Sequence, residues 1–284
     1  MQEYRDDTLI MIDFDEEKIS FDMRYEDKDA VEEMRSSGGS PVPLPKIGRL
    51  YGDMCFPAPP AGRPYTYSSI VLSSDGKMAF TDEPAGPVIA KNNYLDPDGA
   101  LTDFWLLNAL RANAEGQHFH SAIATSPAGG AYLGRKFRKE HFYIGPYDTP
   151  PPAEELKNIR KQLKDGRGVP VFLTGAVDVP DAEILLYLLR HTGHEYLSVE
   201  SPSYAAHLIQ KEALDEMFIN YSLVFAGGPV TPNAANAFSS TRHPHAALRA
   251  LAFHDRHFMF TRQRIVYGVD GPAQSGTAVS KMKY

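Results

Sequence analysis

The residues of this sequence that are best placed for chemistry lie in the stretch from Tyr196 to Gly228. An apolar run, Leu197 to Val199, ends on Glu200, and Ser201 and Pro202 follow directly. Serine is a favoured N-cap and proline is tolerated at the first helical position, so a helix is predicted to begin here. Helix N-terminal N–H groups favour anions, and ligands of open α/β sheets lie at this end of the strands. The pattern therefore predicts an anion-binding turn between a strand and a helix.

Glu200 is placed at the end of this strand beside a helix N-terminus, where a carboxylate stays ionised. It is predicted either to hold a bound ligand by hydrogen bonding or to act as a structural cap. A second apolar run, Met217 to Ala226, ends on Gly227-Gly228 and completes a strand–helix–strand unit around the turn.

Composition limits the class of protein. With 284 residues, 43% of them hydrophobic, the chain can bury a full core as one large domain or two small ones. The net charge of −7 and the pI near 5.8 argue against nucleic acid or an anionic membrane surface as the main partner. The single Cys55 excludes an intramolecular disulfide and a cysteine zinc site. The acidic N-terminus is unlike a signal peptide, and no apolar run approaches the ~20 residues that span a bilayer. We expect a cytoplasmic protein.

Residues 1–63 differ in character from the rest. Thr8–Phe14 and Ile19–Tyr25 alternate apolar and polar residues and predict a β-hairpin. A charged stretch, Glu26 to Arg35, and a passage rich in Gly and Pro follow, which is typical of a linker. We interpret residues 1–63 as an arm that packs on its own subunit or on a partner subunit, and a separate functional module is the alternative.

From residue 64 onwards, predicted strands alternate with predicted helices, which favours a largely parallel sheet flanked by helices. The predicted strands outside the Tyr196–Gly228 unit are Tyr65–Leu72, Phe119–Thr125, Val169–Leu173 and His257–Val266. The predicted helices are Thr102–Asn113, Glu154–Lys164, Asp181–Arg190 and His245–Phe253, and Ser126 to Gly130 is predicted as a loop.

Three sets of motifs resemble the reductase domain of riboflavin biosynthesis, which has the dihydrofolate reductase fold. Arg63-Pro64-Tyr65 through Ser73-Ser74-Asp75-Gly76-Lys77-Met78-Ala79 is similar to that family's first strand and its Ser-x-Asp-Gly-Lys/Arg-Ile-Ala turn. Leu110-Arg111-Ala112 is similar to its Leu-Arg-Ala helix end. Val199-Glu200, Leu214-Asp215-Glu216 and Ala226-Gly227-Gly228 resemble its Val-Glu-Gly-Gly-Pro, Val-Asp-Glu and Gly-Gly motifs. The motifs keep the family's order over about residues 63–268.

The resemblance implies a three-layer α/β domain over residues 64–284, with a mostly parallel central sheet flanked by helices, behind the N-terminal hairpin arm. It also implies an NADPH-dependent reductase, usually a homodimer, that passes a hydride to a pterin-, flavin- or pyrimidine-like small molecule. The cofactor carries the hydride, and the protein orients the nicotinamide against the substrate.

The resemblance further assigns roles to residues. Asp75 joins Glu200 as a catalytic candidate, although Asp75-Gly76 is also a common structural turn. The substrate candidates are Lys77, Trp105 and Arg111, of which Trp105 is also interpretable as a core or interface residue. Arg135 and Lys136 belong to the densest basic run, which is either a solvated charged surface or the site of the cofactor 2′-phosphate. The full set of cofactor candidates is Ser73, Thr125, Ser126, Gly129, Gly130, Arg135, Lys136, Thr174, Gly175, Ser201, Ser203, Gly227 and Gly228.

Two departures from the family pattern bear on this function. Glu200-Ser201-Pro202-Ser203 replaces Glu-Gly-Gly-Pro, so Pro202 donates no hydrogen bond and Cβ atoms restrict a close approach, while the serine hydroxyls become available as donors. Residues 124–130 replace the family's Gly-x-x-Thr turn and Asp-Asn-Pro substrate element. The alternative function is therefore an inactive reductase-fold protein that binds a nucleotide or other ligand or a subunit. A flavin or another nucleotide in the site is a third possibility.

Other chemistries find no motif in the sequence. The group His243, His245, His254 and His257 matches no closed zinc set, and we expect no metal. The His-x-Glu and Pro-Cys-x-x-Cys motifs of the zinc deaminases are absent, as are the α/β-hydrolase elbow and the phosphate loop.

Overall fold

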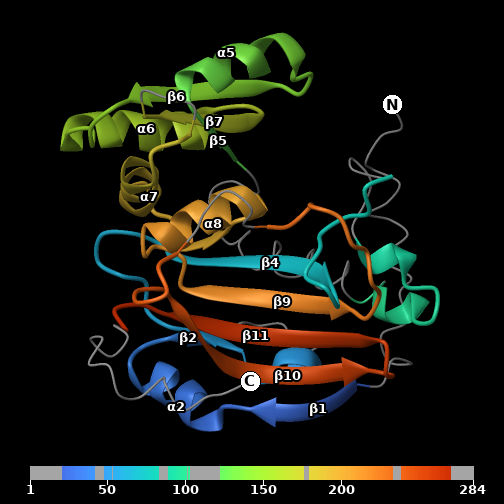
Figure 1. The fold of residues 1–284 in the computed structure, drawn as a ribbon. Helices are drawn as coiled ribbons and strands as arrows, with labels where there is room; N and C mark the ends of the chain where they lie inside the picture. Colours follow the sequence, from blue (N-terminus) through green and yellow to red (C-terminus); the bar gives the residue numbers. More distant parts are fainter. Residues whose placement is uncertain are drawn as a thin grey trace.

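The computed structural model describes residues 21–41, 48–52, 54–82, 89–100, 102, 122–175, 179–232 and 238–269. These residues form a large mixed sheet with a smaller parallel sheet stacked beyond one edge of it (Figure 1). Within the described ranges, no helix is both long enough and apolar enough to cross a membrane.

The large sheet has the strand order β1-β10-β11-β9-β4-β8. Its parallel part is built from β4 (Tyr65–Ser73), β8 (Tyr196–Ser198) and β9 (Glu216–Ser222). Its antiparallel part is built from β1 (Phe21–Glu26), β10 (His245–His254) and β11 (Phe258–Val266). The helix α8 (Pro202–Gln210) connects β8 to β9 and lies against β4 (Figure 1).

The small sheet is parallel throughout, with the order β5-β7-β6. Its strands are β5 (Ile123–Thr125), β6 (His141–Tyr147) and β7 (Val169–Thr174). On one face, α5 (Pro127–Lys136) lies so close that a Cβ on Gly130 would come within 2.6 Å of the Leu173 side chain. On the other face, Phe172 packs with α6 (Ala153–Asp165) and α7 (Ala182–His191). Because neighbouring strand residues face opposite ways, this sheet has helices on both faces.

Helix α7 also connects the two sheets. Its Ala182 and Leu186 pack with Val199, Ala205 and Leu208 around α8, while Ile184, Leu185 and other residues pack against β7. The predicted α/β fold with parallel strands flanked by helices is confirmed, and the antiparallel strands β1, β10 and β11 complete it.

Two predicted elements are wrong. Residues His245–Phe253 form the strand β10, not a helix, because β1 and β11 pair with it on both sides and bury Ala250 and Ala252 on one face. The three alanines before Ala252 have high helix propensity, which tertiary pairing overrides. Ser126 to Gly130 is not a loop but the start of α5, since Ser126 caps the helix and Pro127 occupies its first position.

Some predictions fall outside the described residues. These are the first hairpin strand Thr8–Phe14 and all of the predicted helix Thr102–Asn113 except Thr102, so Trp105 and Arg111 are among them. The second hairpin strand is present as β1, which pairs with β10. The charged stretch after it forms the amphipathic helix α2 (Lys28–Ser36).

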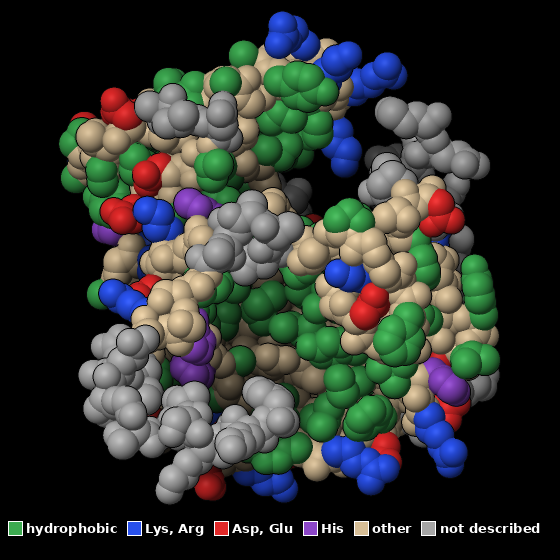
Figure 2. Space-filling view, in the orientation of Figure 1, with side chains coloured by type: hydrophobic (Ala, Val, Ile, Leu, Met, Phe, Trp, Pro, Cys, Tyr) green, Lys and Arg blue, Asp and Glu red, His purple; other side chains and the backbone are tan. Residues whose placement is uncertain are grey.

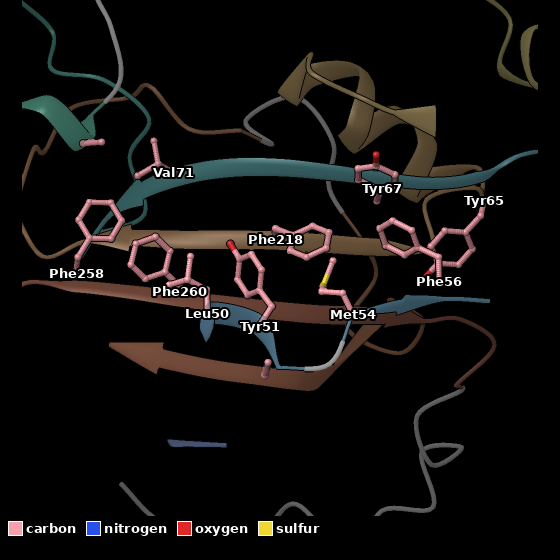
Figure 3. Packing of buried hydrophobic residues seen from close by; sticks show 12 residues of the cluster. Leu50, Tyr51, Met54, Phe56, Tyr65, Tyr67, Val71, Phe218, Phe258 and Phe260 are labelled. Carbon is pink, nitrogen blue, oxygen red and sulfur yellow. The ribbon is translucent and has the colours of Figure 1, made fainter. Parts of the chain in front are cut away.

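The predicted arm and linker supply part of the core. After β2 (Ser40–Pro41), the short helix α3 (Gly48–Tyr51) and the strand β3 (Cys55–Phe56) cover one face of the large sheet. Leu50, Tyr51, Met54 and Phe56 are almost fully buried against Phe218, and Figure 3 shows these side chains between the segment and the sheet. These apolar residues lie between two proline-rich stretches, 41–45 and 57–60, and their burial explains why the segment packs on the sheet. The domain boundary near residue 63 stays a prediction.

An ion pair is buried at the centre of this packing. The Arg262 guanidinium lies between the Phe56 and Phe218 rings, with Nε 2.6 Å from Glu216 Oε1 and Nη2 donating to the Cys55 carbonyl at 2.8 Å. Both side chains are at most 2% exposed. Burial lowers the pKa of Arg262, but the Glu216 charge outweighs burial and raises the pKa overall. The pair joins β9, β11 and the N-terminal segment.

Replacing Arg262 with alanine is expected to lower the free energy of unfolding by about 3–5 kcal/mol, because it leaves Glu216 buried without its counter-charge. Denaturant unfolding followed by circular dichroism measures the loss. The double variant Glu216→Leu/Arg262→Met is the control, and it should be clearly more stable than Arg262→Ala. Equal stability of the two variants would contradict the role given to the uncompensated charge.

A second ion pair holds the segment after η3 (Ile89–Asn92) against β10. His254 Nδ1 lies 2.7 Å from Asp96 Oδ1, and the side-chain amide Nδ2 of Asn93 donates to the His257 carbonyl at 2.7 Å. The hydrogen bond to Asp96 raises the pKa of His254; partial burial lowers the pKa, while the charges of Asp96, Asp98 and Asp255 add to the rise.

The His254–Asp96 pair predicts a pH dependence of stability. Because the folded-state pKa of His254 is raised, the stabilisation is fully present below the unfolded pKa of about 6.5 and is lost as pH rises through the folded value. We expect a loss on the order of 1 kcal/mol. Urea unfolding from about pH 5.5 to about pH 9, a range that begins about one unit below the unfolded pKa, measures it, with His254→Gln as control. A His254→Gln variant that kept the same pH slope would contradict the assignment.

Candidate functional site

The loops after β4 and β9 are joined by a backbone hydrogen bond from the Ser74 amide to the Val224 carbonyl (2.8 Å) and by one carboxylate. Strands β4 and β9 end in register, with Ser73 opposite Ser222. Asp75 then accepts hydrogen bonds from the backbone amides of Ala226 (3.1 Å) and Gly227 (2.8 Å) and from the Ser73 hydroxyl (2.6 Å). The structure therefore brings together three of the predicted site residues, Ser73, Asp75 and Gly227, and Asp75 uses both oxygens to hold the neighbouring loop.

Backbone geometry explains the glycines of this edge. Gly76, Gly227 and Gly228 all have φ near +70°, which is costly for other residues. A Cβ on Gly228 would also lie 2.6 Å from Thr81, a neighbour that the motif did not indicate. The amide of Lys77 closes the turn on the Ser73 hydroxyl at 2.8 Å. The Ser73 hydroxyl and the two backbone amides lower the pKa of Asp75 to about 2, so the carboxylate is ionised at neutral pH.

Replacing Asp75 with alanine is expected to make the amide hydrogens of Ala226 and Gly227 exchange with solvent several-fold faster, because both lose their acceptor. Hydrogen exchange read by NMR measures this directly. In the unchanged protein the protection should persist down to about pH 3, since Asp75 stays ionised there. The control is Asp82→Ala at a nearby exposed acid. Unchanged exchange at both amides in Asp75→Ala would contradict the role of this carboxylate.

The predicted strand-to-helix turn is confirmed at α8. The Ser201 side chain accepts from the Tyr204 amide at 3.4 Å, and the Ala205 amide bonds to the Ser201 carbonyl. Ser201 and Ser203 hydroxyls lie 3.2 Å apart and are exposed, as is Glu200. Pro202 has no N–H, so among the described residues the Ser203 amide is the first-turn donor without an acceptor.

This helix start lies some way from the Asp75 turn. Strand β8 pairs with β4 only over Tyr65 to Tyr67, and the Ser68 hydroxyl donates to the Val199 carbonyl just beyond. Glu200 therefore leaves the sheet about 16 Å before β4 ends at Ser73. Among the described residues, no strand pairs with the β8 side of β4 beyond this point. A ligand that touched both the start of α8 and the Asp75 turn would lie along this unpaired side of β4.

A third group of predicted residues lies at the carboxyl edge of the small sheet. Thr125 ends β5 and Thr174 ends β7, and both are at the start of connections to helices. The Thr174 hydroxyl donates to the Asp181 carbonyl, and the Gly175 amide donates to the Tyr147 carbonyl. At Gly129, a Cβ would clash with Thr125, and Gly130 packs on Leu173. Each of these glycines thus has a packing role in the small sheet.

Arg135 and Lys136 lie away from this edge. They occupy the last turn of α5, about 12 Å along the helix from Pro127. In that position they complement the negative end of the helix dipole. The structure therefore does not bring the basic run to the helix starts or to the Asp75 turn.

The residues found only from the structure surround the Asp75 turn. Phe225, between the two amide donors and β9, is 79% exposed, and the hydroxyl of the buried Ser222 has no partner among the described residues. An aromatic residue before Gly227-Gly228 was the available signal for Phe225. Nothing in the sequence pattern indicated Ser222.

Two further features bear on the site. The described residues contain no group of three or more metal-ligating side chains. They also line a pocket of about 260 Å³ near the carboxyl end of α8, where Arg242, His243 and Tyr267 contribute to the wall. None of the sequence-predicted site residues lines this pocket.

No protein-family model and no curated protein matches the sequence. Among solved structures, a pyrimidine reductase-like protein from Corynebacterium diphtheriae is 14% identical, with a TM-score of 0.43, and the alignment covers 78% of this chain and 98% of that protein. RibD from Acinetobacter baumannii is 13% identical, with a TM-score of 0.42, over 72% of this chain and 59% of RibD. The chain thus spans about three fifths of RibD.

The riboflavin biosynthesis reductase of Saccharomyces cerevisiae is 10% identical, with a TM-score of 0.40, over 78% of this chain and 98% of that enzyme. These proteins are of the kind that the sequence motifs resemble. The chain is distantly similar to solved reductases of riboflavin biosynthesis over most of its length.

Proposed function

We propose that this protein is an oxidoreductase that transfers a hydride from NADPH to a pterin-, flavin- or pyrimidine-like small molecule. The observation that carries the proposal is the stretch of β4 beyond Tyr67, with which no described strand pairs on the β8 side. It runs from the start of α8 to the Asp75 turn, on the carboxyl side of parallel strands, where ligands of α/β sheets bind.

The helix start fits an anionic group of a dinucleotide. The Ser203 amide and the hydroxyls of Ser201 and Ser203 are donors within one turn, and the positive end of the α8 dipole adds to them. Glycines at positions 201 and 202 would let a phosphate approach the backbone more closely. With Ser201 and Pro202 there, the hydroxyls of Ser201 and Ser203 take over part of the donation from the backbone. These residues would hold a phosphate, while the nicotinamide, when bound, supplies the hydride.

The Asp75 turn is a positioning device in this proposal. Its carboxylate is committed to Ala226, Gly227 and Ser73, so it fixes the two loops rather than moving a proton. Lys77 follows it as a substrate contact, and the exposed Phe225 ring beside it suits a planar heterocycle. Water or the substrate itself would provide the proton, and Glu200 would contact the ligand at the other end of the β4 edge.

A titration with NADPH, NADH and NADP⁺, read by nicotinamide fluorescence or calorimetry, tests the cofactor. We expect NADPH to bind with a dissociation constant in the range of about 1–100 μM. The Ser203→Pro variant removes the amide donor and the hydroxyl and should weaken binding about tenfold or more. Ser203→Ala keeps the amide and should weaken it less. Weakening in Arg135→Ala or Lys136→Ala instead would place the 2′-phosphate at the basic run.

Absence of nucleotide binding up to millimolar concentration in correctly folded protein would overturn the proposal. The second function, an inactive reductase-fold protein that binds another ligand or a subunit, would then lead. The commitment of both Asp75 oxygens and the Ser-Pro-Ser start of α8 are the observations that favour it.

Homodimerisation and a cytoplasmic location are further parts of the proposal, and light scattering at micromolar concentration tests the dimer.

A further inference from the structure

Cations gather at the end of the small sheet that lies opposite its helix starts. Two segments, residues 135–141 and 161–167, together contain seven Lys and Arg but two Asp and Glu, in a chain whose net charge is −7. The cations are Arg135, Lys136, Arg138, Lys139, Lys161, Lys164 and Arg167, and all of them are exposed. Figure 2 shows Lys and Arg side chains gathered at one end of the layer that holds α5 and β6. We call these two segments the basic end.

The fold places the two segments side by side. Strands β6 and β7 are parallel neighbours, with His141 opposite Val169, so the connections that enter them lie at the same edge. The Val169 amide donates to the Glu140 carbonyl at 2.9 Å, and the space beside Gly166 is filled by the Phe142 ring. The basic end is thus one continuous surface although its halves are far apart in sequence.

Helix dipoles account for only part of this charge. Arg135, Lys136 and Lys164 lie in the last turns of α5 and α6, where a cation stabilises the helix. Arg138, Lys139 and Arg167 lie beyond the helices, next to the first residues of β6 and β7. Like charges brought together at these positions cost stability, so a partner of opposite sign is the natural counterpart.

The neighbouring strand edge is open. Strand β6 is at the end of the β5-β7-β6 order, and among the described residues no strand pairs with its outer side. Its second half is irregular, with Pro146 and a register shift after Ile144, whereas His141 to Ile144 pair regularly with β7. Tyr143 is 39% exposed on this half. An extended segment can hydrogen-bond to such an edge.

We propose that the basic end and the first half of β6 form a docking surface for an extended acidic segment of a partner protein. The segment adds as a strand beside His141 to Ile144, and its carboxylates lie over Arg138, Lys139 and Arg167. Charge complementarity selects an acidic partner, and the open backbone edge selects an extended one. A nucleic acid is disfavoured because the chain as a whole is acidic. This inference does not rest on the proposed reductase function.

The test is fluorescence anisotropy with the full chain and a short labelled peptide that alternates glutamate with valine. We expect binding that weakens as ionic strength rises from about 0.05 M to about 0.5 M. The Arg138→Glu/Lys139→Glu variant should weaken it about tenfold or more. The matched control, Lys91→Glu/Arg256→Glu, reverses two exposed cations elsewhere and should change it less than about twofold.

Two control peptides separate charge from strand pairing. Glutamine in place of glutamate should abolish binding, and N-methylation of alternate residues, which keeps the charge but removes donors, should weaken it strongly. Undetectable binding of the acidic peptide, equal effects of the two charge-reversal variants, or unchanged affinity after N-methylation would each overturn the proposal. Tighter binding of a single-stranded oligonucleotide would also overturn it, in favour of a nucleic-acid surface.

Discussion

Arg262 carries a charge in the core between two aromatic rings, and its charge is met by Glu216 on the adjacent strand. A buried ion is tolerated only when it is paired and its remaining donors are satisfied. Here Glu216 accepts from Nε and Nη2, and a further acceptor for Nη2 is the Cys55 carbonyl, which lies in the N-terminal segment. Residues 55 and 56 are therefore required where they are, because moving them would leave a guanidinium donor unsatisfied and expose the surrounding rings. This requirement holds the segment with α3 and β3 against the face of the large sheet that it covers.

The parallel half faces a different requirement. Its strands end in turns and helix starts rather than in hairpins, so polar backbone groups collect at one edge. Strand β8 pairs with only the first three residues of β4, and the contact through Asp75 lies beyond the other end of β4. Between these two places, no described strand pairs with this side of β4. The same chain thus combines an antiparallel part that the N-terminal segment covers with a parallel part in which β4 is unpaired beyond β8 among the described residues.

Local signals predicted the elements with strong caps or long periodic runs. Ser201-Pro202, Asp181 and the run from Val169 all gave elements close to those observed. Prediction failed where pairing decides the outcome. The alanine-rich β10 is a strand because of its neighbours on both sides. The apolar residues Leu50, Tyr51, Met54 and Phe56, which lie between two proline-rich stretches of the sequence, become core only when a sheet lies beneath them. Ser126-Pro127 carried the same cap signal as Ser201-Pro202, but the two glycines that follow obscured it.

For the candidate site, the motifs predicted which residues lie at strand ends but not which of them lie close together in space. Ser73, Asp75 and Gly227 came together because a turn motif and a Gly-Gly motif end paired strands. Arg135 and Lys136 did not join them, since charge density along a sequence says nothing about which end of a helix faces which strand edge. Phe225 and Ser222 are near Asp75 only through the register of β9 with β4.

The link through Asp75 also has an evolutionary consequence. Two loops that are about 150 residues apart in the sequence meet at the Asp75 carboxylate, beside the backbone hydrogen bond from the Ser74 amide to the Val224 carbonyl. Substitutions in the 73–77 turn and in the 224–228 loop therefore act on the same contact, and their effects are not additive. The two segments are expected to vary as a pair among descendants of this sequence, as a single inherited unit divided between two places in the chain.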